Sequence, residues 1–190
     1  ISALLAAEVD GDRLSDDDIA TFAVVLLLAG HVTTTVLLGS SLLCFDAFPE
    51  VRAAVSADPT LVPAAIEEAM RFQPPFPRNL RRTTRDVEIG GVTIPADKPL
   101  SVWLAAANRD PAVFADPEAF DLHRSPNPHL AFGLGPHFCL GAPLARLESR
   151  IALGELLRRF PDLSVAGTPE HYPSVSMMVG PTRLPVRTGA

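Results

Sequence analysis

A long uncharged segment constrains this chain more than any other feature. Residues 19 to 45 contain no Asp, Glu, Lys or Arg. Ser15, followed three residues later by Asp18, has the capping-box pattern with Asp in the Glu position, so we expect a long helix from there to about Asp46. A helix that is apolar nearly all round is either a membrane span or the buried centre of a large fold. His31, the threonines at 33–35 and the lack of a flanking Lys or Arg cluster favour the buried helix.

Composition excludes several classes of protein. Sixteen basic and 22 acidic residues give a net charge of −6, which argues against a nucleic-acid partner and a basic membrane-surface helix. A hydrophobic content of 47% fits a globular chain, and 190 residues suggest one domain or a large part of one. Two cysteines cannot form a dense disulfide framework, and the first residues lack the pattern of a signal sequence, so none is expected. We therefore expect a soluble, cytoplasmic protein with neither a nucleic-acid nor a membrane partner.

The remaining pattern predicts a mainly α protein with small β-sheets. Two shorter helices are expected at 49–58 and 63–72, and one more between Gly141 and Pro161. Two hairpins are expected. One covers residues 86–94, with its turn at Gly90-Gly91, and the other is formed by residues 175–179 and 184–186. A strand or buried run is expected at 100–107. Residues 108–128 have no period and are expected to be functional or packed on another element. The apolar face of the last helix is expected to be Leu144, Leu147, Ile151, Leu156 and Phe160.

The strongest chemical signal is a glycine-rich loop that contains a cysteine. Residues 132–141 read FGLGPHFCLG and precede the last predicted helix. Glycines permit positive φ angles and let the backbone approach a flat partner closely. The helix N-terminus favours the thiolate of Cys139, and loop N–H groups can donate to its sulfur. A thiolate held in this way is suited to be an axial ligand of heme iron.

Other interpretations of the cysteines are simpler. A free cysteine is usually a small buried apolar residue, which is the expected role of Cys44 in the middle of the long helix. His123, His129, His137 and Cys139 lie close in sequence and leave zinc as an alternative. No Cys-x-x-Cys pair or standard His spacing supports it.

The cysteine loop resembles the heme-binding signature of the cytochrome P450 monooxygenases, Phe-Gly-x-Gly-x-His/Arg-x-Cys-x-Gly, and every defining position is filled. The following residues, APLAR at 142–146, resemble the usual bacterial continuation. The resemblance implies the C-terminal half of the cytochrome P450 fold and a heme b cofactor. Cys139 would be the proximal iron ligand and His137 would reach a heme propionate. The residues framing the heme would include Phe132, Gly133, Gly141 and Ala145.

A second element is the sequence Glu68-Ala69-Met70-Arg71. Residues at i and i+3 share a helix face, so Glu68 and Arg71 can touch, although Glu67 is an ordinary surface alternative for Arg71. The placement resembles the family's Glu-x-x-Arg element, in which the pair is buried and braces the cysteine loop. Family members often add a third partner from a Pro-Glu-Arg-Phe element, but Ala119 stands at that arginine position here. Arg109 or Arg124 is expected to substitute for it.

A third element lies in the uncharged helix, where residues 29–34 read AGHVTT. The family pattern is Ala-Gly-x-Asp/Glu-Thr. By resemblance, Ala29 and Gly30 leave room for dioxygen, and Thr33 hydrogen-bonds the dioxygen or an ordered water and locally opens the helix. The alternative for a lone threonine is a hydrogen bond to its own helix. Val32 replaces the acidic residue that normally helps to relay protons, so we expect more uncoupling to peroxide than in relatives.

Weaker assignments follow from the same resemblance. Arg81 matches a propionate-binding arginine, although it is also compatible with a solvated charge beside Arg82. Core packing is the alternative for the residues that match segments lining the substrate pocket. These pocket residues are Phe76, Pro77, Arg78, Asn79, Met177 and Met178.

The resemblance implies a heme-thiolate monooxygenase that inserts one oxygen atom from dioxygen into a small apolar organic substrate, usually by hydroxylation. The sequence resembles those of soluble actinobacterial members of the family that tailor polyketides and related natural products. Electrons are expected from a ferredoxin and its reductase. The ferredoxin is expected to dock near Arg124, Arg146 and Arg150.

The resemblance also implies that residues 1–190 form a single heme-binding region, the C-terminal half of a larger domain. The missing N-terminal half is therefore an expected partner, and a large apolar surface is expected in its absence. Two other functions remain open. One is a non-catalytic heme- or substrate-binding remnant, suggested by Val32 and the missing half. The other is a zinc-binding module that uses His137 and Cys139.

Overall fold

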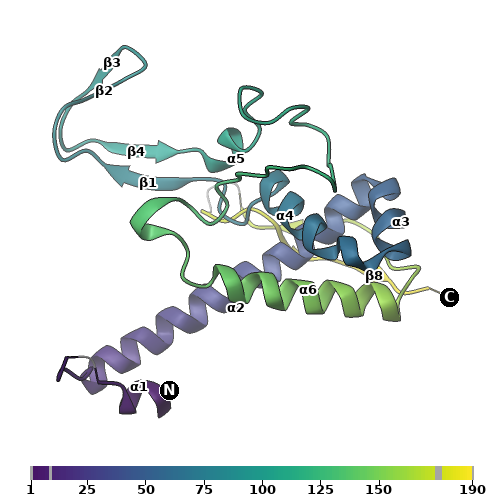
Figure 1. Cartoon of the computed structure of the whole chain (residues 1–190), viewed down its shortest axis with the longest axis horizontal. Coiled ribbons are helices and arrows are strands. Elements are labelled where there is room, and N and C mark those ends of the chain that lie inside the picture. Colours follow the sequence, from purple (N-terminus) through teal and green to yellow (C-terminus); the bar gives the residue numbers. More distant parts are fainter. Residues whose placement is uncertain (1, 9, 174–176, 190) are drawn as a thin grey trace.

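The computed structural model describes residues 2–8, 10–173 and 177–189. Helices dominate, and all β-structure consists of two-stranded pairs, as predicted. The longer helices are α2 (Asp16–Ala47), α3 (Pro49–Ala57), α4 (Val62–Phe72) and α6 (Ala142–Arg159); the short ones are α1 (Ser2–Ala6), η1 (Pro59–Leu61), α5 (Leu104–Ala107) and η2 (Gly135–His137). Helices α2, α4 and α6 pack against one another, while the strands between residues 79 and 102 project away from them (Figure 1).

Helix α2 begins where the sequence predicts. The Ser15 hydroxyl accepts the Asp18 N–H at 3.2 Å, and the Asp18 carboxylate accepts the Ser15 N–H at 3.2 Å, which completes the capping box. Burial is uneven along the helix. Apart from Ile19, the buried residues lie between 36 and 45, whereas Leu27 and Leu28 are 72% and 67% exposed. The expectation of a buried central helix therefore holds for the C-terminal part only, because the described chain places nothing against the rest. By length and composition alone, α2 is long enough to cross a membrane.

The core lies where α3, α4 and α6 meet the C-terminal part of α2. Helix α4 is the centre of this arrangement, because seven of its eleven residues are buried. Three rings from separate segments close one end of the core: Phe48, Phe72 and Phe120 have centroids 5.4 to 5.9 Å apart. The segment 108–128, which the sequence predicts to be functional or packed on another element, therefore packs on this end of the core through Phe120.

Helix α6 buries a different face from the one expected. Leu144, Leu147 and Ile151 are 55%, 43% and 57% exposed, whereas Leu153 and Leu157 are 0% and 7% exposed. Both sets recur at helical spacing, so periodicity could not distinguish them. The packing of α6 against α2 and α4 selects the second set. The first remains as an apolar stripe on the surface.

The strands that precede the cysteine loop agree largely with the sequence. Strands β2 (Val87–Ile89) and β3 (Val92–Ile94) form the predicted hairpin, and Gly90 and Gly91 take φ angles of +58° and +77° at its turn. Strand β1 (Asn79–Arg82) pairs with β4 (Pro99–Val102). The run at 100–107 is thus part strand and part helix, because it ends in α5.

The predicted final hairpin is wrong in its pairing. Strand β8 (Val186–Arg187) pairs with β5 (Ser164–Val165), and β7 (Pro181–Arg183) pairs with β6 (Glu170–His171). Residues 175 and 176 of the predicted first strand lie outside the described residues. The strands are too short for a register to be read from alternation, and contacts with α2 from β5 and β7 position them instead.

Candidate functional site

The cysteine loop leads from the core to the N-terminus of α6. Gly133 and Gly135 take φ angles of +76° and +79°, so the loop follows a path that favours glycine at both positions. The Cys139 N–H donates to the Phe132 carbonyl at 2.9 Å, and the Ala142 N–H donates to the Cys139 carbonyl at 3.2 Å. These bonds fold the loop back on itself. Cys139 is exposed at the start of α6, together with Leu134 and Leu140.

The other cysteine is unsuited to chemistry. Cys44 is 2% exposed in the core, and burial raises the pKa of its thiol to about 12. This agrees with its predicted role as a small apolar residue. Cys139 is therefore the one accessible thiol of the chain's two cysteines.

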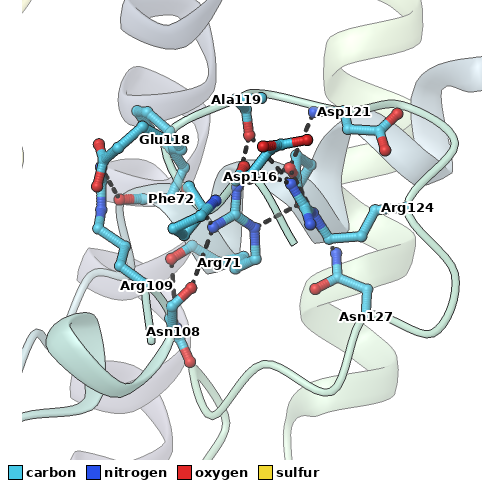
Figure 2. A network of polar contacts seen from close by, with 12 residues as sticks. Arg71, Phe72, Asn108, Arg109, Asp116, Glu118, Ala119, Asp121, Arg124 and Asn127 are labelled. Atoms are coloured by element: carbon cyan, nitrogen blue, oxygen red, sulfur yellow. Dashed lines mark hydrogen bonds and ion pairs between the residues drawn. The ribbon is translucent and has the colours of Figure 1, made fainter. Parts of the chain in front are cut away.

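Glu68 and Arg71 form a fully buried ion pair, with both side chains 0% exposed. Arg71 donates to Glu68 through Nε and Nη2, each at 2.8 Å. Its remaining N–H groups reach the carbonyls of Asn108, Pro117 and Ala119 at 2.7 to 3.0 Å. Arg71 thus joins α4 to the segment 108–128 (Figure 2).

Arg124 takes the place of the arginine that is missing at Ala119. Its Nε donates to Glu68 Oε1 at 3.0 Å, and its side chain is only 8% exposed. Figure 2 shows it on the opposite side of the network from Arg109, which instead pairs with Glu118 and donates to the Phe72 carbonyl. Burial alone would raise the pKa of Glu68, but hydrogen bonds, first that from Arg71, lower it overall. The expectation that Arg124 offers charge to a docking partner is wrong, because Glu68 already binds it.

The network also reaches the chain just before the cysteine loop. The Asn108 side chain accepts the Leu130 N–H at 2.7 Å, while the Asn108 carbonyl accepts from Arg71. Asn127 donates to Glu68 Oε2 at 3.1 Å. The buried pair is therefore connected through Asn108 and Asn127 to residues 127–130, which lead directly into the loop at Phe132.

Glu67 does not serve as a partner of Arg71. Arg146 binds its carboxylate through Nε at 2.6 Å and Nη2 at 2.8 Å, and His129 lies 3.0 Å away. Burial alone would raise the pKa of Glu67, but these hydrogen bonds, that of Arg146 foremost, lower it to about 2. No local sequence signal identifies this site, because Glu67 and Arg146 are 79 residues apart.

The part of α2 that contains residues 29–33 is a regular helix. Thr33 Oγ1 donates to the Ala29 carbonyl at 2.6 Å, and the helix continues without interruption through residues 29–33. The expected local opening of the helix at Thr33 is therefore wrong for this structure, in which the alternative hydrogen bond is made. At Gly30 an added Cβ would meet no atom within 4 Å, so the described residues leave this side of the helix open.

The residues assigned to the pocket come from two segments that meet. The Val179 N–H donates to the Pro75 carbonyl at 2.9 Å, which brings Met177 and Met178 beside the segment containing Phe76 and Pro77. In the same region Arg78 lies 5.4 Å from the centroid of the Trp103 ring. Asn79 begins β1.

The two residues assigned to the heme propionates are both exposed. Arg81 lies on β1, where its side chain donates to the carbonyl of Leu80, while its neighbour Arg82 pairs with Asp97. His137 ends η2 in the cysteine loop. Among the described residues, neither side chain has a hydrogen bond to a buried group.

The loop fits the heme that the sequence resemblance implies. Its donor is a single exposed sulfur, glycines with positive φ angles stand at positions 133 and 135, and the apolar residues Leu134, Phe138 and Leu140 are 80%, 49% and 85% exposed. A flat apolar ring system with one open iron coordination position matches this set of groups. Zinc does not: across residues 2–8, 10–173 and 177–189, no group of three His, Cys, Asp or Glu is placed to hold a metal ion.

Comparison with known sequences identifies relatives over nearly the whole chain. The cytochrome P450 family model matches residues 1–180. Cyclomarin C epoxidase CymV of Salinispora arenicola is 47% identical over 184 residues, which are 97% of this chain and 47% of the relative. Erythromycin C-12 hydroxylase of Saccharopolyspora erythraea is 47% identical over 193 residues, which are 100% of this chain and 49% of the relative. The chain thus spans about half the length of the relatives it matches.

Solved structures agree with the sequences. HmtN, a post-tailoring hydroxylase involved in himastatin biosynthesis, matches with a TM-score of 0.90 and 51% identity over 98% of this chain and 50% of its own. HmtT, also involved in himastatin biosynthesis, matches with a TM-score of 0.92 and 51% identity over 99% of this chain and 48% of its own. The helices, the cysteine loop and the buried Glu68–Arg71 pair therefore occur together in a partial cytochrome P450 fold, and the chain belongs to the cytochrome P450 family.

Proposed function

We propose that the protein is a heme-thiolate monooxygenase in which Cys139 is the iron ligand. The observation that carries the proposal is the exposed Cys139 at the start of α6, in a glycine-rich loop of a cytochrome P450 fold. The family implies a heme cofactor, and we take it to be heme b. When bound, the heme supplies the activation of dioxygen, which no protein side chain can perform alone.

The cysteine loop would hold the heme by shape and by charge. Phe132, Gly133, Gly141 and Ala145 frame the sulfur on the loop and the first turns of α6. His137 and Arg81 are both exposed and are assigned to the propionates, where each would contribute a donor to an anionic oxygen. The buried Glu68–Arg71 pair is assigned a structural role, supported by its link through Asn108 to Leu130.

Ala29, Gly30 and Thr33 on α2 are assigned to the space that dioxygen would occupy. Gly30 contributes space, and Thr33 would exchange its hydrogen bond with Ala29 for one to dioxygen or an ordered water. Val32 offers no acid at the usual position, so protons would come through water, His31 or a substrate hydroxyl. This arrangement supports activity with increased uncoupling to peroxide.

The reaction proposed is the insertion of one oxygen atom into an organic substrate. One dioxygen, two electrons and two protons are consumed; one oxygen atom enters a C–H bond and the other leaves as water. Relatives named as an epoxidase of cyclomarin C and a hydroxylase of erythromycin support a small, largely apolar natural product as substrate. The pocket would be lined by residues of the two meeting segments, Phe76, Pro77, Arg78, Asn79, Met177 and Met178.

Electrons are assigned to a ferredoxin and its reductase in the cytoplasm. Of the three arginines expected to attract a ferredoxin, Arg150 is exposed, the Arg146 side chain is 39% exposed but bound to Glu67, and the Arg124 side chain is 8% exposed and bound to Glu68. The docking charge is therefore assigned mainly to Arg150 on α6.

We further propose that residues 1–190 are one heme-binding region and that a segment outside them completes the domain. The support is twofold. The relatives are about twice as long as the matched part. In addition, the exposed apolar residues gather on the N-terminal part of α2, on the cysteine loop and on one stripe of α6. A contiguous exposed apolar patch marks a surface that another segment or partner can cover.

The test is the optical spectrum of the purified, dithionite-reduced protein with carbon monoxide. The proposal expects the red-shifted Soret band of a thiolate-ligated heme, which Cys139→Ser abolishes and Cys44→Ser retains. Turnover with a ferredoxin, its reductase and a candidate substrate then separates an enzyme from a non-catalytic heme-binding remnant. An unshifted band in the wild-type protein, or the same band in Cys139→Ser, would refute the assignment of Cys139.

A further inference from the structure

A second polar cluster ties the approach to the cysteine loop to two helices. It consists of Glu67 on α4, Arg146 on α6, and His129 and Phe132 on the segment that leads to Cys139; we call it the Glu67 cluster. Arg146 donates to Glu67 through two hydrogen bonds of 2.6 and 2.8 Å, and His129 Nε2 lies 3.0 Å from Glu67 Oε2. One carboxylate therefore connects α4, α6 and the chain that precedes the loop.

The hydrogen bonds of His129 fix the orientation of its ring. The Ala131 N–H donates to His129 Nδ1 at 3.3 Å, so the ring proton lies on Nε2 and is donated to Glu67. The His129 side chain is only 3% exposed, and its ring centroid lies 6.2 Å from that of Phe132. Glu67 therefore holds a buried histidine ring beside Phe132.

The Phe132 ring is the apolar member of the cluster. The guanidinium carbon of Arg146 lies 4.6 Å from the ring centroid, an arrangement that favours cation–π attraction. The Phe138 ring lies 6.1 Å away within the loop, and Phe132 also packs against the hydrophobic core. Arg146 and His129, the two residues that bind Glu67, therefore also lie against the Phe132 ring.

The backbone of Phe132 makes the hydrogen bond that closes the loop. Its carbonyl accepts the Cys139 N–H at 2.9 Å. The residues between them have few constraints of their own, because glycine has more backbone conformations available than any other residue and Leu134 is 80% exposed. Leu140, which follows the cysteine, is 85% exposed. The position of the Cys139 backbone therefore depends on how firmly Phe132 is held.

We propose that Glu67 is a positioning residue. Through Arg146 and His129 it holds the Phe132 ring, and the Phe132 carbonyl holds the backbone of Cys139 in the place where its sulfur would bind iron. The proposal rests on the proposed function, because the position of Cys139 matters to the reaction only if heme binds there. Glu67 acts entirely through other residues, so it is not catalytic.

Two roles of the Glu67 cluster make different predictions for amide hydrogen exchange. If the cluster holds the loop, the loop amides exchange when the cluster opens, so the loss of Glu67 speeds their exchange. If the cluster only joins α4 to α6, the loss of Glu67 speeds the exchange of core amides, which require global unfolding, and leaves the loop amides unchanged. The loop amides therefore distinguish a positioning role from a general contribution to stability.

The first measurement is amide hydrogen exchange in the purified 190-residue chain, followed by mass spectrometry of its peptides. One peptide covers residues 138–142, which include the Cys139 amide, and another covers the buried part of α2 at residues 36–45. We expect Glu67→Gln and Arg146→Gln each to speed exchange in the loop peptide about fivefold. This increase should not depend on low concentrations of urea, because a local opening exposes little surface.

Two further variants control this experiment. Gly39→Ala crowds Pro181 outside the cluster, so it should speed exchange in the α2 peptide and leave the loop peptide unchanged. Phe132→Leu removes the ring, so adding Glu67→Gln to it should speed loop exchange by less than about twofold further. Loop exchange that is unchanged in Glu67→Gln, or a full effect of Glu67→Gln in the Phe132→Leu background, would overturn the proposal.

The second measurement is the rate at which the heme-loaded protein loses its heme to apomyoglobin. A loop that is held less firmly releases its cofactor sooner, so Glu67→Gln and Arg146→Gln should lose heme about fivefold faster than wild type. Gly39→Ala should lose it at the wild-type rate. Equal rates in the wild-type protein and both cluster variants would contradict the positioning role. If the wild-type protein shows no thiolate-type heme spectrum, the proposed function fails, and the loop exchange rates alone decide whether Glu67 positions the loop.

Discussion

Replacing Arg71 by lysine tests the buried network while retaining its charge. A guanidinium has five N–H groups, and the structure gives each one an acceptor: two bonds go to Glu68 and three to the carbonyls of Asn108, Pro117 and Ala119. A lysine ammonium has three donors, so at least two acceptors lose their partner in a region where Arg71 and Glu68 are 0% exposed.

The cost follows from those two lost bonds. Leaving a buried acceptor unsatisfied costs about 1–3 kcal/mol. Glu68 keeps Arg124 and Asn127 as partners, which limits the damage, so we expect Arg71→Lys to lower the free energy of unfolding by about 2–4 kcal/mol in total. Arg71→Leu removes the charge as well and should cost about 3–5 kcal/mol. With a urea dependence of about 2 kcal/mol/M, Arg71→Lys lowers the urea midpoint by about 1–2 M.

The assay is urea denaturation of the purified protein followed by far-ultraviolet circular dichroism. Arg158→Lys is the matched control, because Arg158 makes the same i,i+3 contact with Glu155 but is 66% exposed. Arg158→Lys should lower the free energy of unfolding by less than about 0.5 kcal/mol. Equal midpoints for the Arg71→Lys and Arg158→Lys variants would refute the reasoning, since they would mean that burial adds nothing to the value of the donors.

Three further outcomes follow from single positions. Hydrogen bonding lowers the Glu67 pKa from 4.5 to about 2, so its stabilising effect is present above pH 4.5 and is lost as the pH falls through about 2. Because the Glu67 side chain is 32% exposed, Glu67→Gln should lower the free energy of unfolding by only about 1–2 kcal/mol at pH 7. The difference from the wild-type protein should disappear near pH 2. A difference that does not change with pH would contradict the lowered pKa of Glu67. Gly39→Ala would place a Cβ 2.5 Å from Pro181 Cγ and should destabilise the protein by about 1–3 kcal/mol. The Cβ of Gly154→Ala would meet no atom within 4 Å, so this helix substitution should stabilise the protein by about 0.5–1 kcal/mol. Urea midpoints in the reverse order would exclude both explanations. Val32→Glu restores an acid on α2 and should lower the peroxide formed per electron consumed during turnover; unchanged coupling would argue against a proton relay at this position.

Local features of the fold could be predicted from the sequence. The capping box at Ser15, the α2 boundaries and the glycine turn of the β2–β3 hairpin depend on residues within a few positions of one another. The contact between Glu68 and Arg71 is also local, since helical spacing alone brings them together. The cysteine loop could be predicted for a similar reason, because its glycines, its cysteine and the helix that follows it are adjacent in the chain.

Features that depend on distant segments could not be predicted. Glu67 matches a surface ion pair with Arg71 by spacing, yet it binds Arg146 on another helix. Val186 has an ordinary strand pattern, yet it pairs with Val165 rather than with the preceding segment. Short strands and single charges have several acceptable partners along a chain, and the choice among them is made by packing.

The sequence by itself determined the four longer helices, the capping box of α2 and the chemistry of the loop around Cys139, because these depend on local spacing and on residue type. Only the tertiary structure decided which stripe of α6 is buried, that Arg124 replaces the arginine missing at Ala119, and that Glu67 connects α4 to the cysteine loop. The physical reason is that a buried charge must be paired and hydrogen-bonded, and the groups that satisfy it are those the packed core brings within reach, regardless of their separation along the chain.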